Sequence, residues 1–288
     1  MIAYLFMIEH QNRFPIRKMA TIFEVSVSGY YAWKTRKPSL HSQADSAIVQ
    51  RIKIIQKRHK GRYGSPRMWK DLRDENVKTS RNRVARLMRQ NGLSAKSTKK
   101  WIATTDSRHK LPVAENILNR EFSTSVPGNK WVSDLTYLKT TQGWLYLCVV
   151  IDLWDRKVIG WSLATDMDAS HTVRALTMAL DNRKPQRSLI FHSDRGIQYC
   201  SKEFRTTLKR TCPTAQQSMS RKGNCWDNAC AESFFKTLKH ELAELNGRST
   251  RKQTHLAVFE YIEAYYNRIR RHSTLGYSTP VAISKLVA

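Results

Sequence analysis

The sequence has few acidic residues for its length. Its 288 residues include 23 Asp and Glu against 50 Lys and Arg, which gives a formal net charge of +27 and a pI of about 10.2. Because so much charge of one sign repels itself in a compact chain, an ordinary metabolic enzyme is disfavoured and a polyanionic partner is expected. Nucleic acid is the commonest polyanion. Hydrophobic residues make up 41% of the chain, which argues against disorder.

Long apolar runs are also missing. The longest run, from Trp144 to Leu153, is interrupted by Asp152 and falls far short of the ~20 residues that a membrane-spanning helix needs. The apolar start, Met1–Ile8, has neither a preceding basic region nor a cleavage site of small residues, so a signal peptide is not expected. We therefore expect a cytoplasmic, nucleoid-associated protein with no membrane partner.

The cysteines form no Cys-x-x-C pair. They are five in number, at positions 148, 200, 212, 225 and 230. An odd count without that spacing indicates a reducing compartment and gives no zinc ribbon. A metal site made of Cys225, Cys230 and His240 is the alternative, but small buried thiols fit the spacing better.

The basic excess is unevenly distributed along the chain. Residues 1–130 carry a net charge of +18, and residues 131–288 carry +9. Helical patterns dominate the first part, whereas the second opens with β-branched and aromatic runs, and a polar stretch with Lys96, Lys99 and Lys100 separates them. We predict a helix-turn-helix region at 1–93, a basic linker at 94–127, an α/β core at 128–245 and a C-terminal helical extension at 246–288.

The N-terminal region contains patterns for two helix-turn-helix units. The first unit has helices at 16–23 and 27–34, with Ser26 as an N-cap. The second has helices at 67–75 and 81–90, with Ser65 and Ser80 as N-caps.

Helix 81–90 has the pattern of a recognition helix. Val84, Leu87 and Met88 form an apolar stripe, and three arginines occupy the other faces, where their cations can contact phosphates or guanine edges: Arg83, Arg86 and Arg89. A small helical bundle with a solvated basic surface is the alternative interpretation. The charge of this region favours DNA binding.

From Lys130 the hydrophobic period becomes that of β-strands. Strands are predicted at 130–139, 144–152, 157–164, 188–191 and 214–219, and helices at 168–182, 202–210 and 227–245. The first three strands are joined by tight turns and form an antiparallel meander. This order predicts an α/β fold with a mixed five-stranded sheet and flanking helices.

Three acidic residues fall where this topology can bring them together. Asp134 lies in the first strand, Asp194 follows the fourth strand, and Glu232 lies early on the last helix. In a meander followed by a crossover, the first and fourth strands can be neighbours. Converging carboxylates repel one another unless a divalent cation neutralises them, and oxygen ligands suit Mg²⁺ or Mn²⁺. Two such ions promote phosphodiester displacement. Each Asp taken alone is better explained as a cap or turn residue.

Several long motifs occur in a fixed order along nearly the whole chain. They are Arg62–Arg67, Trp131–Tyr137, His192–Tyr199, Ser218–Ala229, Glu232–Lys239 and Tyr265–His272. In these motifs the chain resembles the second-frame (OrfB-type) transposases of the insertion sequence 3 family, within the DDE transposase and retroviral-integrase superfamily. A set of ordered motifs is far more specific than a single motif.

The resemblance implies an RNase H-like core and a metal-binding catalytic triad of Asp134, Asp194 and Glu232, with two Mg²⁺ or Mn²⁺ ions per active site. It also implies a basic residue two helical turns after the Glu, here Lys239, near the DNA. A solvated helix residue is the alternative for Lys239. The segment that enters the last helix is expected to contact DNA through Arg221, Lys222 and Asn224, whereas Asn228 fits either a DNA contact or a helix cap.

The spacing between the second and third acidic residues departs from the family pattern. The family usually has 35 residues between them, and this chain has 37 between Asp194 and Glu232. The extra pair is expected near Thr211–Gln216, where a surface turn tolerates it. A decaying element with a damaged core is the alternative. Cys230 and Ala231 also replace the Pro and apolar residue that the family often has before the Glu.

The resemblance implies an enzyme that cleaves and joins DNA strands of an insertion sequence. Its expected partners are the terminal inverted repeats, target DNA, further copies of the chain in an oligomer, and an upstream-frame OrfA protein, as a fusion or as a separate chain. Two other functions remain open from the residues alone: a regulator that only binds DNA, and a general nuclease on the same core.

Overall fold

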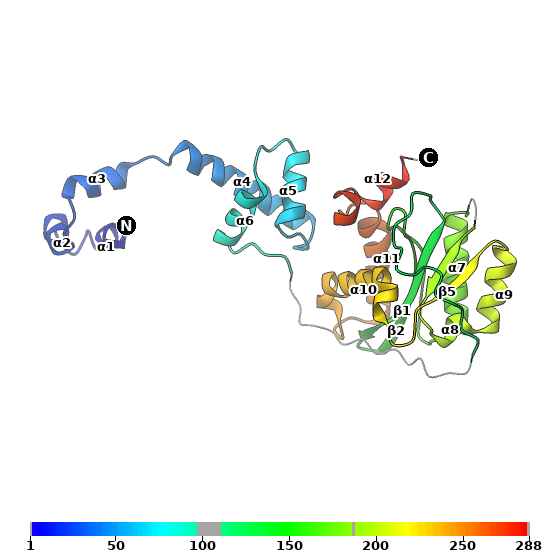
Figure 1. Ribbon diagram of the computed structural model, residues 1–288. Helices are drawn as coiled ribbons and strands as arrows, with labels where there is room; N and C mark the ends of the chain where they lie inside the picture. The colour runs from blue at the N-terminus through cyan, green and yellow to red at the C-terminus, as the bar shows by residue number, and fades with distance from the viewer. Residues whose placement is uncertain (1, 97–110, 186–187, 287–288) are drawn as a thin grey trace.

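The computed structural model describes residues 2–96, 111–185 and 188–286. Figure 1 shows three parts along the chain: a small helical group near the N-terminus, a second helical group, and a sheet covered by helices. The first group consists of α1 (Ile2–Glu9), α2 (Ile16–Ile22) and α3 (Val27–Thr35). These helices pack around Met7, Met19, Ala20 and Tyr30.

The second helical group consists of α4 (Leu40–Arg58), α5 (Ser65–Asp74) and α6 (Arg81–Gln90). As predicted, Ser80 caps α6 by accepting a hydrogen bond from Arg83 N, and the apolar stripe of this helix is buried. The predicted cap at Ser65 is wrong, because Ser65 is the first residue of α5 and Gly64 occupies the cap position. The sequence prediction also lacks α1 and α4.

The predicted mixed five-stranded sheet is confirmed. Its strands are β1 (Lys130–Thr140), β2 (Gly143–Asp152), β3 (Val158–Ala164), β4 (Ile190–Ser193) and β5 (Gln216–Met219), in the order β3-β2-β1-β4-β5. The first three strands form the antiparallel meander, whereas β4 pairs parallel with both β1 and β5. The first and fourth strands are therefore direct neighbours.

Alternating side chains of β1 and β2 supply the cores on the two faces of the sheet. Trp131, Cys148 and Val150 face the helices α7 (Ala169–Asn182), α8 (Ile197–Cys200) and α9 (Lys202–Thr211). Val132 and Val149 belong to the other core, which includes α10 (Ala229–Glu241), α11 (Arg251–Phe259) and residues of α4, α5 and α6. This alternation follows from the period-2 geometry of a strand.

The predicted long helix 227–245 is interrupted in the structure. It consists of the short turn η1 (Cys225–Asn228), α10, and a second short turn η2 (Ala243–Leu245). The fourth strand also lies two residues later than predicted. Beyond α11 the chain continues through the π-helical turn η3 (Glu260–Tyr266), the turn η4 (Ser273–Leu275) and α12 (Pro280–Ser284). Among the described residues, no helix is both long and apolar enough to span a bilayer.

Part of the predicted linker packs on the sheet. Residues 97–110, which include Lys99 and Lys100, lie outside the described residues, but Leu118 is buried. The backbone N–H groups of Ile117 and Leu118 donate to the Ser218 hydroxyl at 2.9 and 3.1 Å. The chain is thereby fixed to β5 before it enters β1.

Helices α4–α6 contact the C-terminal part of the chain through a polar and aromatic network. Arg271 donates to Asp71 and, at 2.6 Å, to Asp74. The Tyr63 hydroxyl accepts from Arg271 N at 3.0 Å, and the Arg62 guanidinium lies 4.4 Å from the centre of the Tyr265 ring. The helix-turn-helix group is therefore held against the same helices that cover the sheet.

Candidate active site

The two aspartates lie on adjacent parallel strands. Val132 of β1 pairs with His192 of β4, so Asp134 and Asp194 stand two positions beyond the same rung of the ladder. Because the strands are parallel, Asp134 in the middle of β1 lies at the same level as Asp194 at the carboxyl end of the shorter β4. Asp194 itself follows the last residue of β4, as the sequence predicted.

Both aspartates are oriented by backbone N–H groups. Asp134 Oδ1 accepts from Leu135 N at 2.8 Å, and Asp194 Oδ1 accepts from Gly196 N at 2.9 Å. Behind them, the Ser133 hydroxyl lies 2.7 Å from the Tyr199 hydroxyl, which joins β1 to α8. These contacts fix the position of both carboxylates relative to the sheet.

Glu232 approaches from the helix α10. It lies in the first turn of α10, whose buried side chains Ala231, Phe234, Phe235 and Leu238 pack against the sheet. Glu232 is on the exposed side of this helix. The structure thus directs the three predicted acidic residues to one region from two strands and one helix.

The electrostatics of the carboxyl groups show that they influence one another. Burial, followed by the charges of Asp194 and Glu232, raises the pKa of Asp134 well above its usual value. Desolvation and the charge of Asp194 also raise the pKa of Glu232. Oxygen donors that repel one another in this way fit a hard divalent cation, which would relieve the repulsion. Within the described part of the chain, no three His, Cys, Asp or Glu side chains stand in a preformed metal-binding cluster.

Lys239 lies on the same helix beyond Glu232. Its ammonium stands 4.7 Å from the centre of the Tyr137 ring of β1. Burial lowers the pKa of Lys239, and the charge of Asp134 opposes that shift. The structure therefore puts this cation within the electrostatic reach of the first aspartate.

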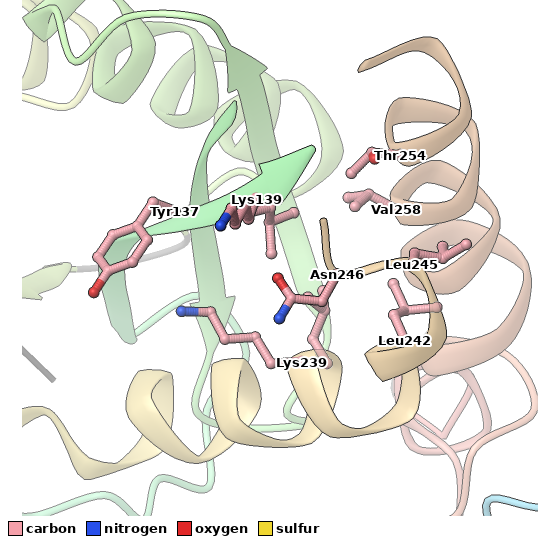
Figure 2. Close-up of a pocket in the computed structure, with 10 residues that line it drawn as sticks. Tyr137, Lys139, Lys239, Leu242, Leu245, Asn246, Thr254 and Val258 are labelled. Carbon is pink, nitrogen blue, oxygen red and sulfur yellow. The ribbon is translucent and has the colours of Figure 1, made fainter. Parts of the chain in front are cut away.

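A shallow pocket adjoins Lys239. It has a volume of about 410 Å³, including space open to solvent, and lies between β1, α10 and α11. Figure 2 shows the Lys239 ammonium directed towards Tyr137, with aliphatic side chains such as Leu242 and Val258 on the other side. The cation thus stands at the edge of a mostly apolar depression.

The loop before α10 is organised by Asp227, which sequence reasoning did not single out. The Asp227 carboxylate is fully buried and accepts from Arg221 Nε at 2.8 Å, Arg120 Nε at 2.8 Å and Asn116 Nδ2 at 3.0 Å. Asn224 Oδ1 accepts from Arg120 Nη2 at 2.9 Å. The sequence did contain a signal for this role, because Asp227 is an acidic residue within the basic motif Ser218–Ala229.

The remaining residues predicted to contact DNA lie on α6 and in the loop before α10. Arg83 and Arg86 both donate to Asp45 of α4, at 2.7 and 2.9 Å, whereas Arg89 is exposed. Lys222 is exposed in the loop before α10. Asn228 occupies the cap position of α10 without a side-chain cap bond, and its amide instead donates to Ser133 O at 3.0 Å.

The extra pair of residues before Glu232 leaves the sheet intact. A turn joins α9 to β5, in which Ala215 N donates to Cys212 O at 2.9 Å. All four residues of β5 pair with β4 in register. This part of the core therefore shows no damage from the longer spacing.

Comparison with known proteins agrees with this geometry. Two integrase core domain families match residues 125–225 and 214–280, and an HTH-like domain family matches residues 43–101. Transposase InsF for insertion sequence IS3A, from Escherichia coli (strain K12), is 42% identical over 96% of this chain and 96% of its own length. The insertion element IS600 uncharacterized 31 kDa protein, from Shigella sonnei, is 41% identical over 92% of this chain and 96% of its own.

Solved structures of viral integrases are similar at lower identity. A chain of the simian T-cell lymphotropic virus intasome, solved in complex with PP2A regulatory subunit B56 gamma, aligns with 14% identity and a TM-score of 0.46, over 81% of this chain and 73% of its own length. The HTLV-2 integrase catalytic core domain in complex with magnesium aligns with 17% identity and a TM-score of 0.43, over 56% of this chain and 99% of its own. The identity to the InsF transposase over almost the full length of both chains decides the family: this chain belongs to the transposases of the IS3 insertion sequences.

Proposed function

We propose that Asp134, Asp194 and Glu232 form the catalytic, metal-binding triad of this transposase, with Lys239 holding DNA beside them. The observation that carries the proposal is the position of the three acidic residues: Asp134 and Asp194 lie at the same level of two adjacent parallel strands, and Glu232, in the first turn of α10, is close enough to raise the pKa of Asp134. It occurs in a chain with a net charge of +27, whose attraction to DNA is expected to be strong. The charges of neighbouring acidic groups raise the pKa of Asp134 and of Glu232, which favours a cation-dependent site in such a chain.

The residues divide the work of a strand-cutting and strand-joining reaction. Asp134 and Asp194 would hold two Mg²⁺ or Mn²⁺ ions between them, and Glu232 would hold one of the two. When bound, such ions supply activation of the attacking oxygen and stabilisation of the leaving oxygen at a phosphodiester. Lys239 would bind a phosphate of the strand next to the triad. Water would attack the phosphodiester at the element end and break its bond to the 3′ oxygen, which leaves as a 3′-OH. This 3′-OH would then attack a phosphodiester of target DNA, which joins the two strands and releases a 3′-OH of the target strand.

Basic residues of the helical regions and of the loop before α10 would bind DNA. Arg83 and Arg86 are neutralised in part by Asp45, so of the three predicted arginines it is Arg89 that is exposed to phosphates or base edges. Arg221, Lys222 and Asn224 lie in the loop before the Glu232 helix, where Arg221 and Asn224 shape the loop and Lys222 is exposed. The partners are the terminal inverted repeats and target DNA, in the cytoplasmic nucleoid. Further copies of the chain and an OrfA protein would complete the assembly.

A product analysis tests the proposal. The protein is incubated with Mg²⁺ and a duplex that carries the inverted repeats flanking this reading frame. We expect nicked ends and joined strands from the wild type. Asp134→Asn should lose both products and keep its affinity for DNA. Asp181→Asn, which changes an exposed carboxylate at the end of α7, is the matched control and should stay active.

Each product pattern has a distinct meaning. Nicks without joined strands would identify a nuclease, and binding without any Mg²⁺-dependent product would identify a regulator. Cleavage by Asp134→Asn at the wild-type rate would refute the assignment of the triad.

A further inference from the structure

Trp226 is a large aromatic residue that the structure leaves exposed to solvent, six positions before Glu232 in the sequence. It is 69% exposed, although tryptophan is highly buried on average in folded proteins. It lies in η1, the turn through which the chain enters the Glu232 helix. An indole in this position gives no support to the core, so its exposure calls for another explanation.

The backbone on both sides of Trp226 is fixed. The next residue, Asp227, is buried and bonded to Arg120 and Arg221. On the other side, Asn224 N donates to Arg221 O at 3.1 Å, and Asn224 also accepts from Arg120. The exposed ring is therefore presented by a held turn, which lowers the entropy that a contact with a ligand would cost.

The turn is also tied directly to the active site. Asn228 donates to the carbonyl of Ser133, the residue before Asp134, at 3.0 Å. Two residues after Trp226, the chain is thus hydrogen-bonded to the strand that carries the first aspartate. The turn that carries the indole is therefore attached to β1 beside Asp134.

Basic side chains belong to the same loop as the exposed ring, or are bonded to that loop. The side chains of Arg221 and Arg120 keep 50% and 44% of their surface exposed while bonded to Asp227, and Lys222 is exposed. An aromatic face among cations is the combination that binds unpaired nucleotides, because the cations attract the phosphates and the ring stacks on the base.

We propose that Trp226 is a stacking platform for an unpaired base of the DNA strand held at the triad. The contact fixes the end of the strand so that its scissile phosphodiester reaches Asp134, Asp194 and Glu232. This inference rests on the proposed function, because it takes the substrate to be a DNA end. It adds a binding residue and a requirement for local unpairing, with little dependence on base identity, since every base offers a π-face.

Fluorescence of 2-aminopurine tests the contact without any chemistry. The base analogue is placed in turn at each terminal position of the inverted-repeat duplex, with the end unpaired, and binding is measured without divalent cations. We expect wild-type protein to quench the probe at one or two adjacent positions. Trp226→Ala and Trp226→Leu should abolish the quenching and weaken binding about 5- to 150-fold, whereas Trp226→Phe should keep most of both. Leu256→Ala, at a 66% exposed site on α11, is the matched control and should behave as wild type.

An abasic nucleotide at the quenched position gives a second, independent readout. If the ring stacks there, wild type on abasic DNA should bind as weakly as Trp226→Ala on normal DNA. Trp226→Ala on abasic DNA should then bind no more weakly than with either change alone. Additive losses, or unchanged quenching in Trp226→Ala, would overturn the proposal.

The two proposals fail in different ways. Quenching without Mg²⁺-dependent products would remove the proposed chemistry and keep the stacking site. Normal cleavage and joining, with no effect of Trp226 variants on binding or quenching, would keep the proposed chemistry and remove the stacking site. Circular dichroism of each Trp226 variant shows whether it is folded, and the exposure of the side chain predicts that all are.

Discussion

Replacing Arg271 by Ala should loosen the attachment of helices α4–α6 to the catalytic region. The Arg271 guanidinium donates to Asp71, to Asp74 at 2.6 Å and to Tyr277 O at 3.0 Å. Only 18% of the Arg271 side chain and 8% of the Asp71 side chain are exposed. The substitution therefore leaves a buried carboxylate with His59 as its remaining partner, at 2.8 Å.

The expected loss of stability follows from that geometry. Removing one partner of a buried ion pair typically costs roughly 3–5 kcal/mol. The bond from His59 to Asp71 survives, and the pair with Asp74 is worth little because the Asp74 side chain is 45% exposed. We therefore expect the free energy of unfolding to fall by about 2–4 kcal/mol at neutral pH.

The pH dependence of stability should change as well. Burial opposes ionisation of Asp71, but the hydrogen bonds from His59 and Arg271 outweigh it and lower the pKa of this carboxyl below its usual value. Its stabilising contribution is therefore present above about pH 4 and is lost as the pH falls through the lowered value. Arg271→Ala should show a smaller loss of stability in that acidic range.

Urea unfolding of the full chain, followed by circular dichroism, measures both effects. Arg210→Ala, which removes an exposed arginine of α9, is the control and should stay within about 0.5 kcal/mol of wild type. If Arg271→Ala is as stable as this control at neutral pH, the network does not hold the helices, and the reasoning is refuted.

Three further substitutions have defined outcomes. Gly160→Ala should lower the free energy of unfolding by about 1–3 kcal/mol, because the added Cβ would lie 2.1 Å from Ala175 O of α7. Thermal unfolding measures this loss, and a variant as stable as wild type would contradict the packing of β3 against α7. Lys239→Gln should weaken DNA binding and reduce the salt slope by about 1, and an unchanged slope would remove the phosphate contact. Burial and nearby arginines lower the pKa of His272 to about 3, so the free energy of unfolding of wild type should fall as the pH drops from about 6.5 towards 3. In His272→Asn the free energy of unfolding should depend less on pH over this range.

The sheet and the order of its strands could be predicted because their signals are local. Trp144–Asp152 is a continuous apolar run, as expected for a central strand, and β2 is paired on both sides. The tight turn before Gly143 defined the meander. The same reasoning made β1 and β4 possible neighbours, and the parallel pairing of the two strands confirms it.

The missed helices have different physical reasons. Helix α1 is apolar with almost no preferred face, so its sequence has no amphipathic period to detect. Helix α4 does have signals, with Ser39 as an N-cap and a buried stripe that includes Ile48, Ile52 and Ile55, and these were open to prediction. The break of the last long helix at Leu242 has no Gly or Pro to mark it, so it depends on tertiary packing.

Contacts between distant residues could not be read from local patterns. The pairing of Arg83 and Arg86 with Asp45 depends on how α4 packs against α6. Likewise, Asp227 meets Arg120 and Asn116 only because the segment before β1 lies against β5. Sequence motifs located the acidic residues, whereas the network that holds the neighbouring loop required the fold.

The central claim, that Asp134 is a ligand of the catalytic cation, is tested most directly by changing its donor atom. A cysteine thiolate is a softer ligand than a carboxylate and discriminates against Mg²⁺. Asp134→Cys should therefore be inactive in DNA cleavage with Mg²⁺ and recover activity with Mn²⁺, whereas Asp181→Cys should cleave with either ion. The same outcome for Asp134→Cys in both ions, whether full activity or none, would contradict the account.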